Sequence, residues 1–126
     1  MKPRNTNIRF KRFEADEHAR KVANLESMIR DFQVMAADLD RQIQAEEDRT
    51  GVRDRTHFAY STFAKSAAQR RDNLRASTAE LTERLDAAMK ARDQALEQLA
   101  QANSADPREQ MRLRRRPDRV TSAQVR

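Results

Sequence analysis

Gly51 is the only glycine in a chain of 126 residues, and the chain contains only three prolines. Because glycine and proline are the residues that most often interrupt regular structure, their scarcity favours long uninterrupted elements. Before Gly51, apolar residues recur with a heptad spacing from Ile8 to Ile43, and a second heptad pattern runs from Ala64 to Ala102. The sequence therefore predicts two long helices that are joined near Gly51.

The first heptad pattern is strongest in its middle. Position a is occupied by Ile8, Ala15, Val22, Ile29, Ala36 and Ile43, and position d by Leu25, Phe32 and Leu39. Nearer the N-terminus, Lys11 and His18 occupy d, so the apolar seam weakens there. We expect a helix from about residue 8 to about residue 48, which Gly51 ends by adopting a left-handed conformation.

The second pattern is thinner because polar residues take half of its a positions. Position a holds Ala64, Arg71, Thr78, Leu85, Arg92 and Leu99, and position d holds Ala67, Leu74, Leu81, Ala88, Ala95 and Ala102. Arginine side chains can lay their methylene groups along such a seam while the charge stays in water. We expect a turn over residues 49–60 and a second helix over residues 61–103, with Ser61 as its N-cap.

Charge along the chain favours folding the second helix back on the first. Residues 22–50 carry three Lys or Arg and seven Asp or Glu, whereas residues 51–77 carry six and two. An antiparallel hairpin sets these opposite charges side by side, while a parallel homodimer sets each block against its own copy. The expected fold class is all-α: an elongated two-helix antiparallel coiled-coil hairpin over residues 1–104, followed by a short helix and a basic tail over residues 105–126.

Several classes of site are excluded by composition. Cysteine is absent, which rules out disulfides and thiolate zinc sites, and no segment approaches the ~18 consecutive apolar residues that span a membrane. His18 and His57 have no second histidine at a metal-binding spacing, and the carboxylates lie among Lys and Arg on expected solvent faces. We expect no catalytic residue, metal site, cofactor or small-molecule substrate.

Aromatic residues gather in and beside the expected turn. His57, Phe58, Tyr60 and Phe63 lie where a hairpin offers few core positions. Two compatible interpretations follow: the rings pack on each other and close the turn, or some of them present a protein-binding surface.

Further apolar side chains lie outside the predicted seam of the first helix. They are Phe10, Phe13, Met28, Val34 and Met35. Because a two-helix chain has no third layer to bury such residues, the isolated hairpin is expected to be marginally stable. These residues indicate where a partner protein docks.

The C-terminal segment contains a basic run formed by Arg112, Arg114, Arg115 and Arg116. Three interpretations are open: a solvated tail, a protein-docking end, or a site for nucleic acid or another anionic partner. No aromatic residues are interleaved to stack on bases, which makes nucleic acid the weaker reading. A basic coiled-coil protein that binds nucleic acid is thus the alternative function, and a homodimeric structural coiled coil is a third.

Several segments resemble the flagellar export protein FliJ of the alphaproteobacterial type. They are Ile8 to Phe13, Asp31-Phe32, Ala36 to Ile43, Ala45 to Glu47, His57 to Lys65 and Gln69 to Leu74. The segment in the turn is more specific than the heptads, which any coiled coil can match. Beyond residue 104 the chain departs from the family pattern, because Pro107, Pro117 and the basic run stand where the second helix would continue.

The resemblance implies a cytoplasmic, non-enzymatic component of the flagellar type III protein export apparatus, peripheral to the inner membrane, that serves flagellum biogenesis, motility and chemotaxis. As a coiled coil similar to the stalk of rotary ATPases, it would engage the export ATPase hexamer, the export gate protein and export chaperones. The residues that would enter the ATPase ring are Phe10, Phe13, Leu96 and Leu99. The residues that would face the gate or chaperones are Phe58, Tyr60 and Phe63.

Overall fold

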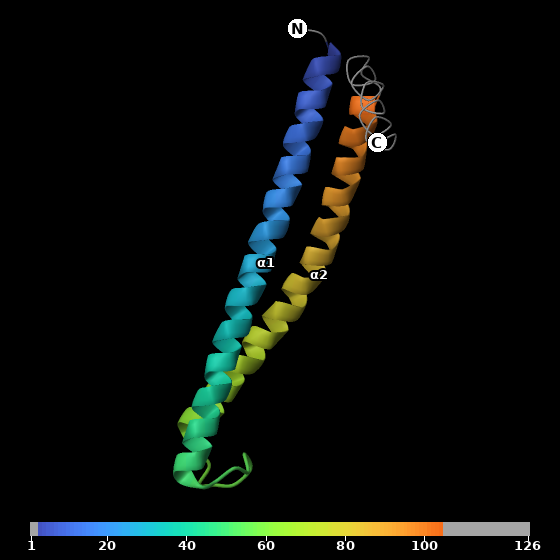
Figure 1. Ribbon diagram of the computed structural model, residues 1–126. Coiled ribbons are helices and arrows are strands. Elements are labelled where there is room, and N and C mark those ends of the chain that lie inside the picture. Colours follow the sequence, from blue (N-terminus) through green and yellow to red (C-terminus); the bar gives the residue numbers. More distant parts are fainter. Residues whose placement is uncertain (1–2, 105–126) are drawn as a thin grey trace, which may run out of the picture. The chain divides into compact units, whose positions relative to one another are not determined.

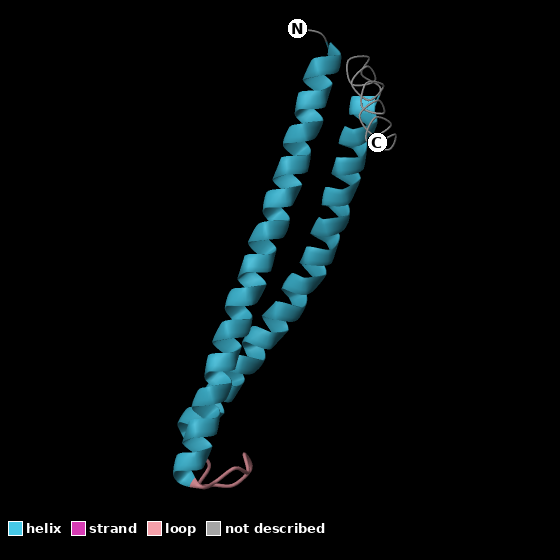
Figure 2. Cartoon of the chain, viewed as in Figure 1, coloured by secondary structure: helices cyan, strands magenta, loops and turns pink. Residues whose placement is uncertain are grey.

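The protein forms two antiparallel helices joined by one loop (Figures 1 and 2). The structure, a computed structural model, describes residues 3–104 and the side chains of residues 5–104. Helix α1 spans Pro3–Thr50 and helix α2 spans Thr62–Ser104, with no strand among the residues described. The predicted all-α, two-helix hairpin is confirmed.

The start of α1 differs from the sequence prediction, because the helix begins at Pro3 rather than near residue 8. Proline is tolerated at the first position of a helix, since its missing N–H would have no intrahelical partner there. The heptad pattern has no strong apolar residue before Ile8, so it carried no signal for this first turn. The end of α1 and both ends of α2 lie within two residues of the predicted bounds.

Gly51 ends α1 as predicted. Its φ angle is 74°, in the left-handed region that favours glycine. Its backbone N–H donates to the carbonyl oxygen of Glu47 over 2.8 Å, which is the single hydrogen bond of an αL C-cap. This bond satisfies one of the carbonyl groups that the end of the helix leaves without an intrahelical donor.

Ser61 caps the start of α2, also as predicted. Its hydroxyl oxygen accepts a hydrogen bond from the backbone N–H of Ala64 over 3.2 Å. Its carbonyl oxygen accepts the first intrahelical bond of α2, from the N–H of Lys65 over 3.0 Å. One side chain and one backbone group thereby fix where the second helix begins.

The described residues form two compact units, each containing a segment of both helices. One unit comprises residues 22–87 and includes the loop, and the other pairs residues 3–21 with residues 88–104. The predicted tail over residues 105–126, with Arg112, Arg114, Arg115 and Arg116, lies outside the described residues. Neither helix contains a stretch that is long and apolar enough to cross a lipid bilayer.

In the unit of residues 22–87, the buried side chains are those that the heptads predict, together with Tyr60 of the loop and Ala68 at an e position. Leu39 and Ile43 of α1 form a cluster with Tyr60 and three alanines of α2, against which Val52 and Leu74 pack. The three alanines are Ala64, Ala67 and Ala68. Because alanine is small, α2 can approach the larger side chains of α1 closely, and Ala64 is fully buried.

The unit of residues 3–21 and 88–104 has a core of small residues. Ala15, Ala88 and Ala95 are buried, while Lys11 and His18 at d positions of α1 are half-buried. The apolar seam is therefore weaker in this unit, as the sequence predicts.

Opposite charges meet across the two helices in the unit of residues 22–87. Both carboxylate oxygens of Asp40 on α1 accept hydrogen bonds from α2, one from Arg71 and one from Arg75, each over 2.8 Å. Arg71 occupies an a position, and its side chain is only 12% exposed. The hydrogen bond to Asp40 is the main reason that the pKa of Arg71 is raised above its ordinary value.

Candidate functional site

The loop between the helices, with Phe63 in the first turn of α2, forms the tip of the hairpin, defined here as residues 51–63. Two consecutive turns shape it. The N–H of His57 donates to the carbonyl oxygen of Asp54 over 3.1 Å, and the N–H of Tyr60 donates to the carbonyl oxygen of His57 over 3.0 Å. The carboxylate of Asp54 accepts hydrogen bonds from the hydroxyl and the N–H of Thr56, which lower the pKa of Asp54. The tip is thus held in a defined conformation.

Two hydrogen bonds tie the tip to the last turns of α1. The hydroxyl of Tyr60 donates to Glu47 over 2.8 Å, and the hydroxyl of Ser61 donates to Glu46 over 2.9 Å. Glu46 also accepts a hydrogen bond from Arg49. This bond is the main reason that the pKa of Glu46 is lowered, and the bond from Ser61 is the second. The two glutamates therefore act as acceptors that close the hairpin.

Tyr60 lies in the core rather than on a binding surface. Only 8% of the residue is exposed, and it belongs to the cluster that contains Leu39, Ile43 and Ala64. Burial is the main cause of its raised pKa, with the hydrogen bond to Glu47 second. The prediction that Tyr60 faces a partner is therefore corrected: this ring packs in the core and closes the turn.

Phe58 is presented to solvent, with 96% of its surface exposed. Its ring stacks on that of His57, with 4.7 Å between the centroids and 22° between the planes. The Nδ1 atom of His57 in turn accepts a hydrogen bond from the N–H of Ala59 over 3.0 Å, which orients the imidazole. Phe63 is 56% exposed on the first turn of α2. Tyr60 thus closes the turn, whereas Phe58 and Phe63 are open to solvent, and partner binding by these two residues stays a prediction.

The predicted helix-end residues all lie in the unit of residues 3–21 and 88–104, but they do not share one face. Phe10 and Phe13, 59% and 58% exposed, occupy heptad positions c and f, on the outer side of α1. Leu99 is half-buried at an a position, and Leu96 is 47% exposed at an e position beside the seam. Phe10 and Phe13 are thus the residues of this set that α2 leaves uncovered.

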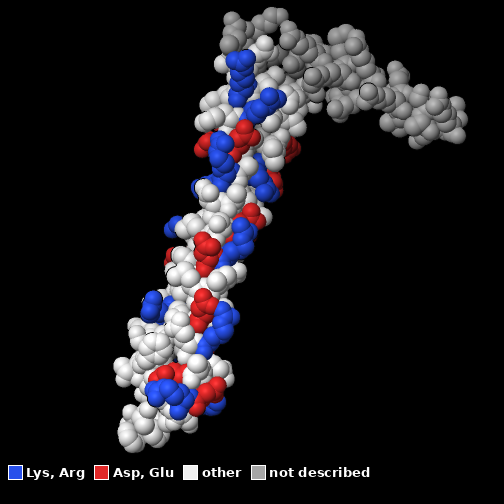
Figure 3. All heavy atoms as spheres, turned by 60° about the vertical axis from the view of Figure 1, so that its left-hand side comes forward, with Lys and Arg blue, Asp and Glu red and all other residues white. Residues whose placement is uncertain are grey.

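Acidic and basic side chains are interspersed on the face shown in Figure 3. Within α1, Arg20 forms an ion pair with Glu17, and Arg41 forms one with Asp38. Nucleic-acid binding relies on a patch or stripe of one sign of charge. The part of this face that the structure describes carries mixed charge instead.

Sequence reasoning missed the residues that fix the tip. In the sequence, Glu46 and Glu47 cannot be told apart from the other carboxylates before Gly51. Their roles depend on the hydroxyl groups of residues more than a dozen positions later. The available signal was local: Glu46 and Glu47 lie in the last turns before the glycine that ends the helix, and a hydroxyl residue lies at the next N-cap. Among the described residues, no group of histidines and carboxylates is arranged to hold a metal ion.

Comparisons of the chain with protein-family models, with curated proteins and with solved structures find no match. The resemblance to FliJ therefore depends on the sequence segments that carry it.

Proposed function

We propose that this protein is a non-enzymatic, cytoplasmic stalk and adaptor of the flagellar type III export apparatus, peripheral to the inner membrane. In this role the helix ends engage the export ATPase hexamer, and the tip engages the export gate protein or export chaperones. The observation that carries the proposal is a large aromatic side chain, Phe58, held outside a closed turn with 96% of its surface exposed.

The geometry of the tip supports a binding role for Phe58. Exposing a phenylalanine to water is unfavourable, and the hairpin already has a buried aromatic residue, Tyr60, that closes the turn. The stacked imidazole of His57 restricts the ring of Phe58, which reduces the entropy that would be lost on binding. An exposed, oriented aromatic side chain is typical of a binding hot spot.

The polar groups near the tip support a structural role rather than a catalytic one. Asp40, Glu46 and Glu47 each accept hydrogen bonds from side chains that join α1 to α2 or to the loop. A carboxylate engaged in this way stabilises the hairpin. Proteins that work by presenting surfaces need such a fixed scaffold.

The ATPase arm of the proposal is tested by mixing the full chain with the export ATPase hexamer and measuring binding and ATP hydrolysis. We expect the protein to bind the hexamer and to raise its hydrolysis rate. Replacing both Phe10 and Phe13 by alanine should weaken binding by about tenfold, the scale of lost aromatic anchors. Gln44→Ala is the control, because Gln44 is exposed on the same helix, lies in the other unit and belongs to none of the proposed binding surfaces.

The tip arm is tested with the purified export gate protein and export chaperones. Phe58→Ala should reduce binding to one of them by about tenfold, whereas Gln44→Ala, at an exposed position of α1, should leave it unchanged. If the unmodified protein neither binds the gate or a chaperone nor stimulates the ATPase, the proposed function is wrong.

A further inference from the structure

One side of the unit of residues 22–87 carries exposed methionines along the line where the helices meet. In an antiparallel helix pair, the g positions of both helices lie on the same side of the seam. Met28 and Met35 occupy g positions of α1 and are 44% and 48% exposed, respectively. On α2 the g positions facing this side include Arg70 and Ser77. We call this side the methionine face.

The methionine face is hollowed between the helices into an open groove of about 260 Å³. Its apolar floor is formed by Phe32 and Met35 of α1 and by Leu74 of α2. Its polar wall is formed by Arg70, Asn73 and Ser77 of α2. Phe32 and Leu74 are seam residues at d positions that the partner helix covers only in part.

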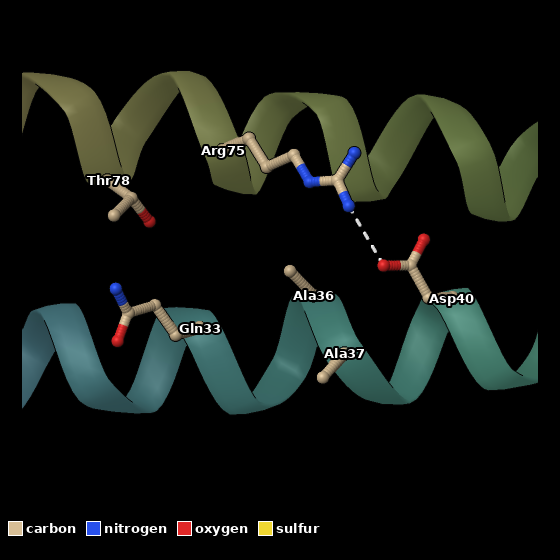
Figure 4. Close-up of a pocket in the computed structure, with 6 residues that line it drawn as sticks. All are labelled: Gln33, Ala36, Ala37, Asp40, Arg75 and Thr78. Atoms are coloured by element: carbon tan, nitrogen blue, oxygen red, sulfur yellow. Dashed lines mark hydrogen bonds and ion pairs between the residues drawn. The ribbon is translucent and has the colours of Figure 1, made fainter.

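The opposite side of the same helix pair has a different character. Its groove, of about 370 Å³, is lined by Gln33, Ala36, Ala37, Asp40, Arg75 and Thr78 (Figure 4). There the arginine is already paired, because Arg75 binds Asp40 across the groove over 2.8 Å. Because its apolar side chains are small and its arginine is already paired, this groove offers a partner little apolar surface and no free positive charge.

The guanidinium of Arg70, in contrast, has no ion pair or hydrogen bond with any residue that the structure describes. It lies at the wall of an apolar groove, where a carboxylate that displaces water would interact more strongly than on an open surface. An unpaired guanidinium beside methionine and phenylalanine matches a ligand that is apolar on one side and acidic at its edge.

We propose that the methionine face binds an amphipathic helix of a partner protein, with an acidic residue that pairs with Arg70. The apolar stripe of that helix fills the groove over Phe32, Met35 and Leu74, and a third helix is thereby added to the pair. A helix fits because a groove between two helices accepts the ridge of side chains of another. Methionine suits such a surface because its flexible thioether side chain adapts to the side chains that it meets.

Charge argues against two other occupants of this groove. The C-terminal segment of the chain, residues 107–126, carries seven Lys or Arg and only two Asp or Glu, so it would bring like charge to Arg70. A second copy of the chain has a formal net charge of +6 and would be repelled by the first. An acidic helix is attracted to the same groove. This site lies apart from the tip and the helix ends and does not depend on the proposed function.

The methionines of the chain provide the first test. The full chain, labelled with ¹³C at its methionine methyl groups, is mixed with a synthetic amphipathic helix that has leucines at its a and d positions and glutamates beside them. We expect the NMR signals of Met28 and Met35 to shift, while that of Met89, in the other unit, stays unchanged. Shifts confined to Met89, or no shift at saturating peptide, would overturn the proposal.

Charge reversal provides the second test. Arg70→Glu should weaken binding of the glutamate peptide by about tenfold, because an attraction is replaced by a repulsion. Lys65→Glu makes the same change of charge at another exposed position of α2 and should alter the affinity less than twofold. Circular dichroism establishes that both variants keep the helical fold.

A peptide in which lysines replace the glutamates distinguishes charge recognition from apolar binding alone. This peptide should bind the unmodified chain weakly and the Arg70→Glu variant more tightly. Equal affinity of both peptides for the unmodified chain would overturn the assignment of an acidic partner. A concentration-dependent dimer in analytical ultracentrifugation that Arg70→Glu abolishes would instead assign the methionine face to a second copy.

Discussion

Tyr60 and Glu47 are joined by a hydrogen bond in which the phenolic hydroxyl donates to the carboxylate over 2.8 Å, thirteen residues apart in the chain. The bond links the loop to the last turn of α1, where the carbonyl of Glu47 also accepts the N–H of Gly51. The aromatic residue that closes the turn is thus fixed by polar as well as apolar contacts.

Removing this hydroxyl tests its contribution. Tyr60→Phe should lower the free energy of unfolding by about 1 kcal/mol, the typical net value of a hydrogen bond, because the ring remains packed. Urea unfolding followed by circular dichroism measures the change. Phe58→Ala is the control: its side chain is almost fully exposed, so unfolding should change by less than about 0.5 kcal/mol. A larger loss in the control than in Tyr60→Phe would contradict the assignment.

The pKa of Tyr60 gives a prediction at alkaline pH, and the chain has only this tyrosine. Burial and Glu47 raise the pKa of Tyr60 in the folded protein above its ordinary value of 10.0. The unfolded chain therefore releases the proton first. Stability from this residue is fully present below pH 10.0 and is lost as the pH rises towards the folded pKa. The phenolate absorbance should titrate above pH 10.0 in the native protein and near it in denaturant; identical midpoints would be inconsistent with a buried phenol.

Gly51→Ala tests the conformation at the end of α1. Apart from Gly51 and its two chain neighbours, no residue has an atom within 4 Å of the Cβ that alanine would add, so the main effect is on the backbone energy. Holding a residue with a side chain at a φ of 74° costs about 1–2 kcal/mol. Gly51→Asn should cost less, because asparagine adopts this region more readily. Thermal unfolding should rank the proteins glycine, asparagine, alanine; an alanine variant as stable as the parent would exclude the αL cap.

Arg71 and Asp40 allow a prediction about stability. Arg71→Leu fills the a position with an apolar side chain and should raise the free energy of unfolding by about 1 kcal/mol, less than for a fully buried pair. Asp40→Ala leaves Arg71 without its partner on α1 and should lower stability by about 1 kcal/mol. The two variants should therefore shift the urea midpoint in opposite directions. A loss of stability in both would show that the pair contributes more than an apolar seam residue does.

Most of the fold could be predicted because it depends on local patterns. The heptads identified both helices and nearly every buried residue, since the side of a helix that faces its partner follows directly from residue spacing. Gly51 and Ser61 were predicted as caps because their backbone roles require particular residue types. The early start at Pro3 was missed because a first turn without apolar residues leaves no periodic signal.

The site was less predictable because its members are joined by contacts between distant residues. The aromatic cluster marked the tip correctly as a feature, but only three-dimensional packing separates the buried Tyr60 from the exposed Phe58. The pairing of Arg71 with Asp40 required the register of the two helices, which charge blocks set only coarsely. The spacing of Phe10 and Phe13 placed both outside the seam, and the structure leaves both exposed.

The unequal size of the seam residues determines which helices can pair. Helix α1 contributes bulky side chains such as Leu39 and Ile43, whereas α2 contributes mainly alanines such as Ala64 and Ala67. The large side chains of α1 fill the space that small side chains of α2 leave, whereas two copies of α2 would leave voids between their alanines. Size complementarity within one chain therefore favours the pairing of α2 with α1 over the pairing of α2 with its own copy.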